Sequence, residues 1–277
     1  MASITDQVTI LYCFADDFLK AHPTQAAWRR SNHRAPGFTD AEVIAIGLMQ
    51  GCLGVATLKH AYLLIAQNFG HLFPKLPCYA QWLARLHKVA ALVGRLVQKA
   101  SLPLDDNVYL MDSKPVPVCK PIRHGRVRLL RDEDAYWGRN KAGWYFGFKL
   151  HVVAHHSGAI LGAFLTPANW DDRDVAPALA EALEGGILLA DLGYQDVKEL
   201  EPLLWDELGL LLITPAHAPK EQRALVSSVR ERIETTFSGL WSRFVDRVFS
   251  RSWHGLWNTI KLKMLHYNLC QAGILPT

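Results

Sequence analysis

The sequence has few cysteines, and they do not form a pattern used by disulfide frameworks or zinc fingers. Its 277 residues include five cysteines at long spacings, without any Cys-x-x-Cys pair. An odd number at such spacings argues against both kinds of site. We therefore expect reduced thiols in the protein interior at Cys13, Cys52, Cys78, Cys119 and Cys270.

The sequence also lacks a long apolar run. The longest stretch, 43–58, is broken by Gln50 and three glycines, and it falls short of the ~20 apolar residues that a membrane-spanning helix needs. The first six residues do not show a basic segment followed by an apolar one, which is the pattern of a secretory signal. These absences predict a cytoplasmic protein that does not enter the membrane.

Charge of one sign does not dominate, since the net charge is only +4 at pH 7. The basic residues are nevertheless unevenly spread. Residues 114–149 carry nine basic and three acidic side chains, and residues 230–263 carry seven and three. Basic patches beside acidic clusters suit a protein that binds a polyanion and keeps carboxylates for a metal. A solvated loop is the alternative interpretation of the same pattern.

The first part of the chain is predicted to form a helical domain over residues 1–105. Apolar side chains recur at helical spacing between Ile4 and Leu19. Thr39 and Glu42 have the spacing of a capping box, which predicts a helix that starts near Asp40.

A further helix is predicted over 79–99, with basic residues on its surface. Arg85 and Lys88 lie outside the apolar stripe that includes Trp82 and Leu86. Such a surface can follow the phosphates of DNA, whereas an ordinary solvent-facing surface is the alternative.

The pattern of apolar residues changes after residue 105, near a segment that is rich in turn residues. With 277 residues the chain fits two units, and we place a second domain at 106–250 and a helical segment at 251–277. Alternating and apolar runs predict strands at 108–112, 145–155, 160–165, 187–190 and 210–213. Helical patterns follow at 172–183, 197–208, 221–244 and 256–272. This order predicts an α/β fold with flanking helices.

Three carboxylates are prominent because of where they fall in these elements. Asp112 ends an apolar strand, Asp191 directly follows the buried strand 187–190, and Glu234 lies inside the long helix 221–244. Ligands of open α/β sheets gather at the carboxyl ends of strands. Aspartates also make turns and caps, so each residue alone is weak evidence for a site.

Four segments together resemble the DDE transposases of bacterial insertion sequences. They are 111–119, 145–151, 190–194 and 232–238, which read MDSKPVPVC, YFGFKLH, ADLGY and RIETTFS. The resemblance implies a ribonuclease H-like mixed sheet with flanking helices, preceded by a helical DNA-binding domain. It also implies that Asp112, Asp191 and Glu234 are the catalytic, metal-binding triad.

The resemblance implies two Mg²⁺ ions as cofactors, for which Mn²⁺ substitutes. Two such ions neutralise charge on the attacking and leaving oxygens of a phosphodiester, and hard cations prefer oxygen ligands. The implied reaction cleaves DNA at the element ends and transfers the 3′ hydroxyl strand to target DNA. The implied partners are the terminal inverted repeats, target DNA and a second copy of the chain on DNA, in the cytoplasm and on the nucleoid.

Two other functions stay open from the sequence. The chain is alternatively a catalytically inactive DNA-binding relative with a regulatory role, or a metal-dependent nuclease that does not join strands. The complete triad argues against the first, and the large helical region argues against the second.

Basic residues near the triad are candidates for DNA contact. They are Lys114, Lys149, Arg230 and Arg232, with Arg126 and Arg128 in the basic segment 120–141. Surface ion pairs, neutralisation of the carboxylates and a disordered connector are the alternatives for these side chains.

Two further groups are expected to be structural. The acidic run 169–174 is expected to cap the helix that follows it, with a role in the site as the alternative. His151, His155 and His156 lack a Cys or His pair at zinc-ligand spacing, so we expect ordinary core or surface histidines there.

Overall fold

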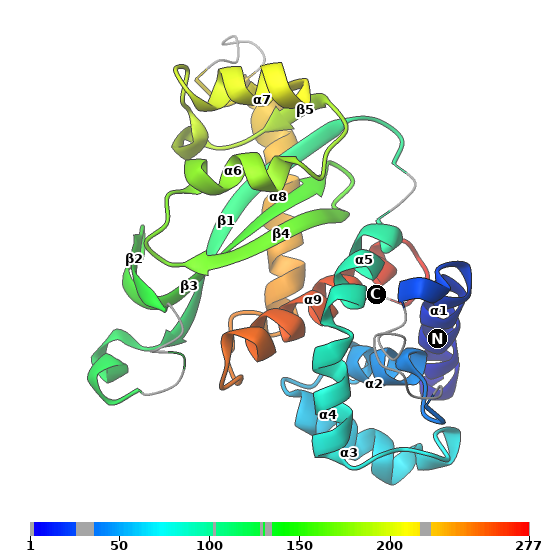
Figure 1. The fold of residues 1–277 in the computed structure, drawn as a ribbon. Helices are drawn as coiled ribbons and strands as arrows, with labels where there is room; N and C mark the ends of the chain where they lie inside the picture. Colours follow the sequence, from blue (N-terminus) through cyan, green and yellow to red (C-terminus); the bar gives the residue numbers. More distant parts are fainter. Residues whose placement is uncertain are drawn as a thin grey trace. The chain divides into compact units, whose positions relative to one another are not determined.

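The chain divides into two compact units. One consists of Met1–Ala100 with His254–Thr277, and the other of Ser101–Trp253 (Figure 1). The computed structural model describes residues 3–25, 36–101, 104–127, 130, 135–216 and 223–276, without the side chains of 223–226, 229 and 230. The stretch 251–277, expected as a separate segment, is divided by the boundary between these units. In the described residues, we find no helix that is long and apolar enough to cross a membrane.

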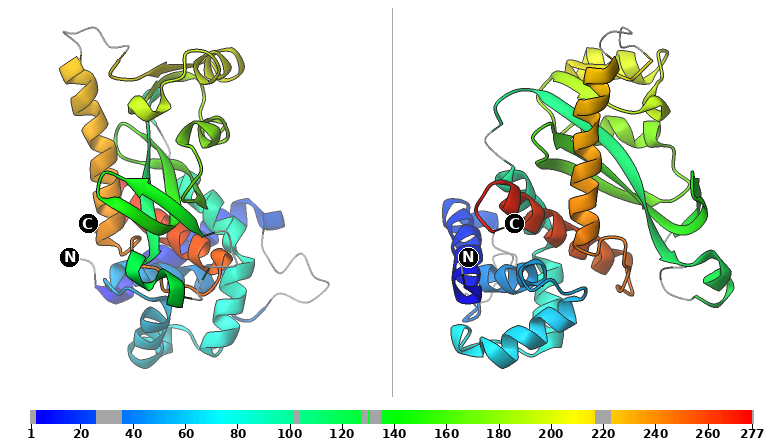
Figure 2. Two further views of the ribbon diagram at one scale, coloured as in Figure 1. Left: turned by 90° about the vertical axis from the view of Figure 1, so that its left-hand side faces the viewer. Right: turned by 180° about the vertical axis from the view of Figure 1, so that it is seen from behind.

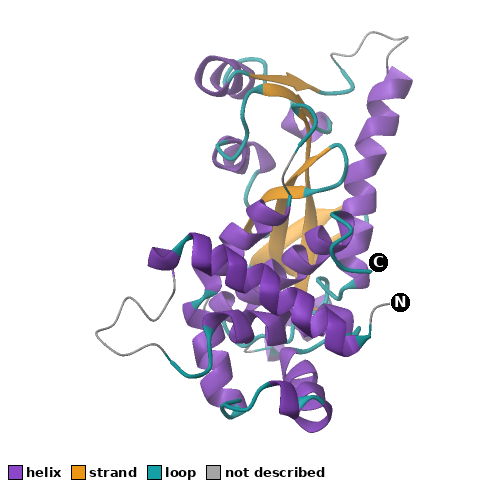
Figure 3. Ribbon diagram, turned by 90° about the vertical axis from the view of Figure 1, so that its right-hand side faces the viewer, coloured by secondary structure: helices purple, strands orange, loops and turns teal. Residues whose placement is uncertain are grey.

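In the described residues of the first unit, all regular secondary structure is helical (Figure 3). Its α-helices are α1 (Ile4–Ala21), α2 (Asp40–Cys52), α3 (Leu58–Asn68), α4 (Tyr79–Lys88), α5 (Ala90–Ala100) and α9 (Trp253–Gln271), with short 3₁₀ turns η1 (Pro23–Gln25) and η3 (Gly70–Leu72). The predicted capping box is present, since the Glu42 amide donates to the Thr39 hydroxyl and the Thr39 amide donates to the Glu42 carboxylate. The start of α2 is therefore determined by local sequence.

The single helix predicted over 79–99 is wrong, because the structure breaks it at Val89 into α4 and α5. Side chains of α9 bind carbonyl groups around this break. The Asn258 amide donates to the Leu86 carbonyl at 3.0 Å, and the Lys261 ammonium donates to the Ala90 carbonyl at 2.6 Å. The Leu86 carbonyl lies in the last turn of α4, where carbonyls lack partners within the helix, and its partner comes from a segment that is remote in the sequence.

Arg85, predicted to contact DNA, instead joins α4 to the start of α2. Its guanidinium donates to the Asp40 carboxylate at 2.7 Å and to the Phe38 carbonyl. The Asp40 side chain is only 3% exposed and that of Arg85 is 22% exposed. The guanidinium therefore has a structural role inside this unit, whereas Lys88 is exposed on the same helix.

We predict that Arg85→Ala lowers the free energy of unfolding by about 3 kcal/mol, because it removes one partner of a buried ion pair. Lys88→Ala is the matched control on α4, and an exposed position of this kind changes stability by at most about 0.5 kcal/mol. Urea unfolding of the two variants measures the difference. Equal stabilities would show that the Arg85–Asp40 pair does not stabilise the fold.

The second unit is built around a six-stranded mixed sheet. Its strands are β1 (Val108–Cys119), β2 (Tyr136–Asn140), β3 (Gly143–His155), β4 (Ile160–Pro167), β5 (Gly186–Leu189) and β6 (Leu210–Ile213). The order is β2-β3-β1-β5-β6, with β4 also paired to β3. β1, β5 and β6 are parallel, and the pairs that involve β3 are antiparallel. The predicted α/β, ribonuclease H-like mixed sheet with a helical N-terminal region is confirmed.

Helices cover both faces of this sheet (Figure 2). α6 (Asp172–Ala180) and α7 (Leu200–Leu208) bury one face in a core that includes Met111, Val153 and Leu188. α8 (Arg223–Ser242) lies against β1 on the other face. Because side chains alternate along a strand, Asp112 and Lys114 lie on the α8 face and Ser113 lies on the α6 face.

The basic segment 120–141 contains regular structure that the sequence analysis did not predict. It includes the 3₁₀ helix η4 (Pro121–Arg126) and the strand β2. The His124 ring lies 4.8 Å from the Trp137 ring and 4.4 Å from the Phe146 ring, between centroids. These contacts pack η4 onto the end of the sheet, so the described part of this segment is not a disordered connector.

Candidate active site

The parallel pairing of β1 with β5 places Asp112 beside Asp191. The last paired residues are Leu110 and Leu189, and each aspartate lies two residues beyond its own strand's member of that pair. Neighbouring strands are about 4.8 Å apart, and residues two apart point to the same face. The two carboxylates therefore occupy equivalent positions at the carboxyl end of the parallel pair.

The expectation that Asp112 ends a strand is wrong. β1 continues to Cys119 because its antiparallel partner β3 extends past Asp112, which pairs with Val152. The strand end at this site is that of β5. Among the described residues, β1 pairs with β5 only over 108–110, so the middle of β1 has no strand partner on that edge. Ligands of α/β sheets bind where strands end in this way.

Asp191 is held by the backbone that follows it. It is the N-cap of the 3₁₀ helix η5 (Leu192–Tyr194), and its Oδ1 atom accepts from the Gly193 amide at 2.8 Å. A Cβ atom at Gly193 would lie 2.9 Å from that oxygen. Glycine at 193 therefore permits the close approach that orients the Asp191 carboxylate.

Tyr194 lies in the core beside the site and is influenced by the charges of the two aspartates. Its side chain is buried, and its hydroxyl lies near Ser113 without a well-aligned hydrogen bond. Burial raises the pKa of Tyr194 well above its usual value, and the charges of Asp172, Asp112 and Asp191 raise it further. The phenol therefore stays neutral among three carboxylates, and we infer that it remains a hydrogen-bond donor there.

Asp172 has a larger role than the helix cap expected for the run 169–174. The cap is Asp171, whose Oδ1 accepts from the Arg173 amide at 3.0 Å. Asp172 Oδ1 instead accepts from the Ser113 hydroxyl at 3.0 Å and from the Lys149 ammonium at 2.9 Å. The sequence showed two adjacent aspartates, but only the fold could show which one turns toward the sheet.

Lys149, predicted to contact DNA phosphate, is paired within the protein. Its ammonium donates to the Asp172 carboxylate and, at 2.8 Å, to the Trp170 carbonyl. The side chain is 17% exposed. This geometry agrees with the alternative role considered for it, the neutralisation of carboxylate charge beside the site.

His151 lies on the α6 face of the sheet, beside Asp172. It is fully buried, its Nε2 atom lies 2.8 Å from the Thr166 hydroxyl, and its Nδ1 atom lies 3.5 Å from Asp172. Burial lowers the pKa of His151 to about 4, with Asp172 acting in the opposite direction and Lys149 adding to the decrease. The imidazole is therefore neutral at pH 7, as expected for a core histidine.

This buried histidine predicts a loss of stability in mild acid. Its pKa is about 4 in the folded protein and ~6.5 in the unfolded chain. The unfolded chain therefore binds more protons between these values, so stability present above pH ~6.5 is lost as the pH falls toward ~4. We expect His151→Gln to remove about 2–3 kcal/mol of this pH-dependent loss. Urea unfolding at pH 7 and pH 5 tests this, and equal pH slopes for both proteins would contradict it.

The comparison with known families identifies this unit. Residues 104–237 match a family described as Transposase DDE domain. The chain carries a transposase DDE domain. No curated protein and no solved structure matches it. The family implies a DNA substrate and the use of divalent metal ions.

The third predicted carboxylate of the transposase, Glu234, is exposed on α8. One turn later, the Phe237 ring packs against Lys114, whose ammonium lies 4.9 Å from the ring centroid and 5.9 Å from that of Trp241. This contact fixes Lys114 of β1 against α8. Glu234 therefore lies on the helix that covers the Asp112 face of the sheet.

The remaining basic candidates of the transposase fall into two groups. Arg232 on α8 and Arg126 on η4 are exposed, as DNA contact requires. Arg128 and the side chain of Arg230 lie outside the described residues.

Proposed function

We propose that this transposase cleaves DNA at the ends of an insertion element and transfers the 3′ hydroxyl strand to target DNA. Asp112, Asp191 and Glu234 are the proposed catalytic residues. The observation that carries the proposal is the equivalent placement of Asp112 and Asp191 at the end of the parallel β1–β5 pair. Both carboxylates also raise the pKa of the buried Tyr194.

The residues at this place suit hard divalent cations. Asp112, Asp191 and Glu234 offer only carboxylate oxygens, which Mg²⁺ and Mn²⁺ prefer as ligands. Two bound ions would activate the attacking oxygen and neutralise the leaving oxygen of a phosphodiester. We propose Mg²⁺ as the natural cofactor, with Mn²⁺ as a substitute.

The chain's own residues prepare the site for this chemistry. The Gly193 amide fixes one oxygen of Asp191, which leaves the rest of the carboxylate available to a cation. The Lys149 ammonium pairs with Asp172 and so reduces the negative charge that surrounds Asp112 and Asp191. Exposed Arg232, Arg126 and Lys88 are the proposed contacts to DNA phosphates.

Transposition joins two element ends to one target, so we propose that two copies of the chain act together on DNA. The helical region at 1–105 is the proposed reader of the terminal inverted repeats. Its exposed Lys88 belongs to α4, whereas Arg85 is committed to Asp40. Of these two residues, Lys88 is therefore the better candidate for a DNA contact.

The test is an assay on a plasmid that carries the gene with its native flanking DNA. The purified protein is incubated with Mg²⁺ or Mn²⁺ and a second DNA, and both cleavage ends and joined products are mapped. We expect nicks at defined element ends and strands joined to the second DNA. EDTA should abolish both products.

Two outcomes distinguish the alternatives. Cleavage at scattered positions without joined products would show a metal-dependent nuclease. Specific binding to the element ends without cleavage in either metal would show a DNA-binding relative and would overturn the catalytic assignment.

A further inference from the structure

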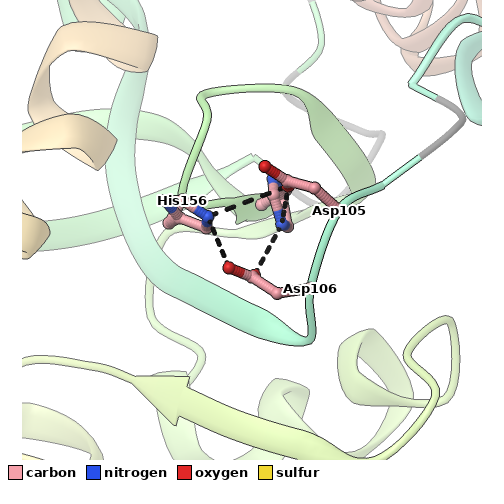
Figure 4. A group of neighbouring side chains, drawn as sticks. Asp105, Asp106 and His156 are labelled. Carbon is pink, nitrogen blue, oxygen red and sulfur yellow. Dashed lines mark hydrogen bonds and ion pairs between the residues drawn. The ribbon is translucent and has the colours of Figure 1, made fainter.

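A second group of potential metal ligands lies near the start of β1, away from Asp112 in the middle of that strand. Asp105 and Asp106 precede β1, His155 is the last residue of β3, and His156 follows in the turn to β4. Figure 4 shows the side chains of Asp105, Asp106 and His156 pointing toward one another. Asp105 and Asp106 lie before Val108, and Asp112 lies four residues along β1 from Val108, which corresponds to about 13 Å. This group is therefore distinct from the proposed catalytic site.

The spacing of the ligand atoms fits a small tetrahedral cation. His155 Nε2 lies 3.0 Å from Asp106 Oδ1 and 3.4 Å from Asp105 Oδ1. His156 Nε2 lies 3.0 Å from Asp106 Oδ2 and 4.0 Å from Asp105 Oδ1. Bonds of 2.0–2.1 Å to a tetrahedral Zn²⁺ place neighbouring ligand atoms about 3.4 Å apart. The group therefore needs little rearrangement to surround such an ion.

The Nε2 atoms of both imidazoles lie beside the Asp106 carboxylate. The His155 side chain is 1% exposed, and its Nδ1 atom lies 2.8 Å from the Ser157 hydroxyl. The Ser157 amide also donates to Nδ1 at 3.2 Å, so Nε2 carries the proton toward Asp106 Oδ1, and a cation bound there would displace that proton. The His156 Nε2 atom is buried and, although Asp106 Oδ2 lies 3.0 Å away, it makes no aligned hydrogen bond. A cation among the four atoms would give the His156 nitrogen a partner.

We propose that Asp105, Asp106, His155 and His156 bind a divalent transition-metal ion of the zinc type. Two neutral imidazoles and two carboxylates balance the charge of such an ion. Imidazole suits Zn²⁺ and Co²⁺, whereas Mg²⁺ prefers sites made of oxygen alone. The ion ties the segment before β1 to the turn after β3, so its effect is on stability and not on the reacting DNA.

The sequence analysis expected His155 and His156 to be ordinary histidines, because neither has a Cys or His partner at zinc-ligand spacing. Their proposed partners are aspartates about fifty residues earlier in the chain. The antiparallel register of β1 with β3, which pairs Tyr109 with His155, brings the two segments together. A scan of local motifs does not detect such a site.

The experiment measures Zn²⁺ and Co²⁺ binding to the full chain after treatment with a chelator. We expect one ion of Co²⁺ to give the absorption of a tetrahedral complex, and Zn²⁺ to displace it and raise the thermal midpoint. A double variant, Asp106→Asn with His156→Gln, should lose more than about 100-fold in Zn²⁺ affinity, since even outer-shell changes cost about 10–100-fold. Both substitutions keep side-chain size and avoid the fully buried His155.

The matched control is a double variant of the proposed catalytic site, Asp112→Asn with Asp191→Asn. It should keep tetrahedral Co²⁺ binding and the Zn²⁺-dependent rise in thermal midpoint. The proposal is overturned if the wild-type protein gives no tetrahedral Co²⁺ spectrum, which would leave the group as side chains that contact only one another. It is also overturned if the signal depends on Asp112 and Asp191 but survives the Asp106 and His156 changes. Neither result depends on transposase activity.

Discussion

Asp191→Asn is expected to lower metal-dependent DNA cleavage by about 10³-fold while the protein stays folded. The amide oxygen of asparagine can still accept from the Gly193 amide, as Asp191 Oδ1 does. The change removes a negative charge and a strong ligand for a divalent cation. Charge stabilisation by a bound ion contributes several kcal/mol to such reactions, and about 4 kcal/mol corresponds to about 10³-fold in rate. The rate of plasmid nicking in Mg²⁺ measures the effect.

The matched control is Asp174→Asn, which changes an exposed aspartate in the first turn of α6. It should cleave at the wild-type rate. If Asp191→Asn also cleaves at that rate with an unchanged unfolding curve, Asp191 is not a catalytic residue.

A double variant tests whether Asp191 and Asp112 act together. Residues that act as a unit show strongly non-additive effects. The double variant Asp112→Asn with Asp191→Asn should therefore cleave no more slowly than the worse of its two single variants. Multiplicative losses would show that the two carboxylates serve separate steps.

Asp172→Ala is expected to lower the free energy of unfolding by about 3 kcal/mol. The change removes the acceptor of the Lys149 ammonium and of the Ser113 hydroxyl. It leaves a positive charge on a side chain that is only 17% exposed. Removal of one partner from a buried ion pair costs about 3–5 kcal/mol, and the 25% exposure of Asp172 places this case at the lower end.

Urea unfolding at pH 7 measures this loss, with Asp174→Ala as the control in the same helical turn. Asp172→Asn should be intermediate, because the amide oxygen still accepts hydrogen bonds but does not neutralise Lys149. If Asp172→Ala and Asp174→Ala are equally stable, the Asp172 contacts do not stabilise the sheet face.

Much of the architecture could be predicted from local patterns. The strand at 210–213 matches β6 as observed, and the helix expected at 221–244 is α8 at Arg223–Ser242. Apolar runs and helical periodicity depend on burial of one side of an element, which neighbouring residues already reveal. The break at Val89 was missed because side chains of α9 bind the carbonyls on either side of it.

For the site too, some features follow from the sequence and others depend on the tertiary structure. The sequence by itself determined the family, the α/β class and the three candidate carboxylates, because these depend on residue identities in short segments. Only the tertiary structure decided that Asp172 binds Lys149, that Arg85 binds Asp40 and that Asp105 and Asp106 meet His155 and His156. Each of these contacts joins residues between 23 and about fifty positions apart. Strand register and helix packing set such contacts, and neither is encoded in a local pattern.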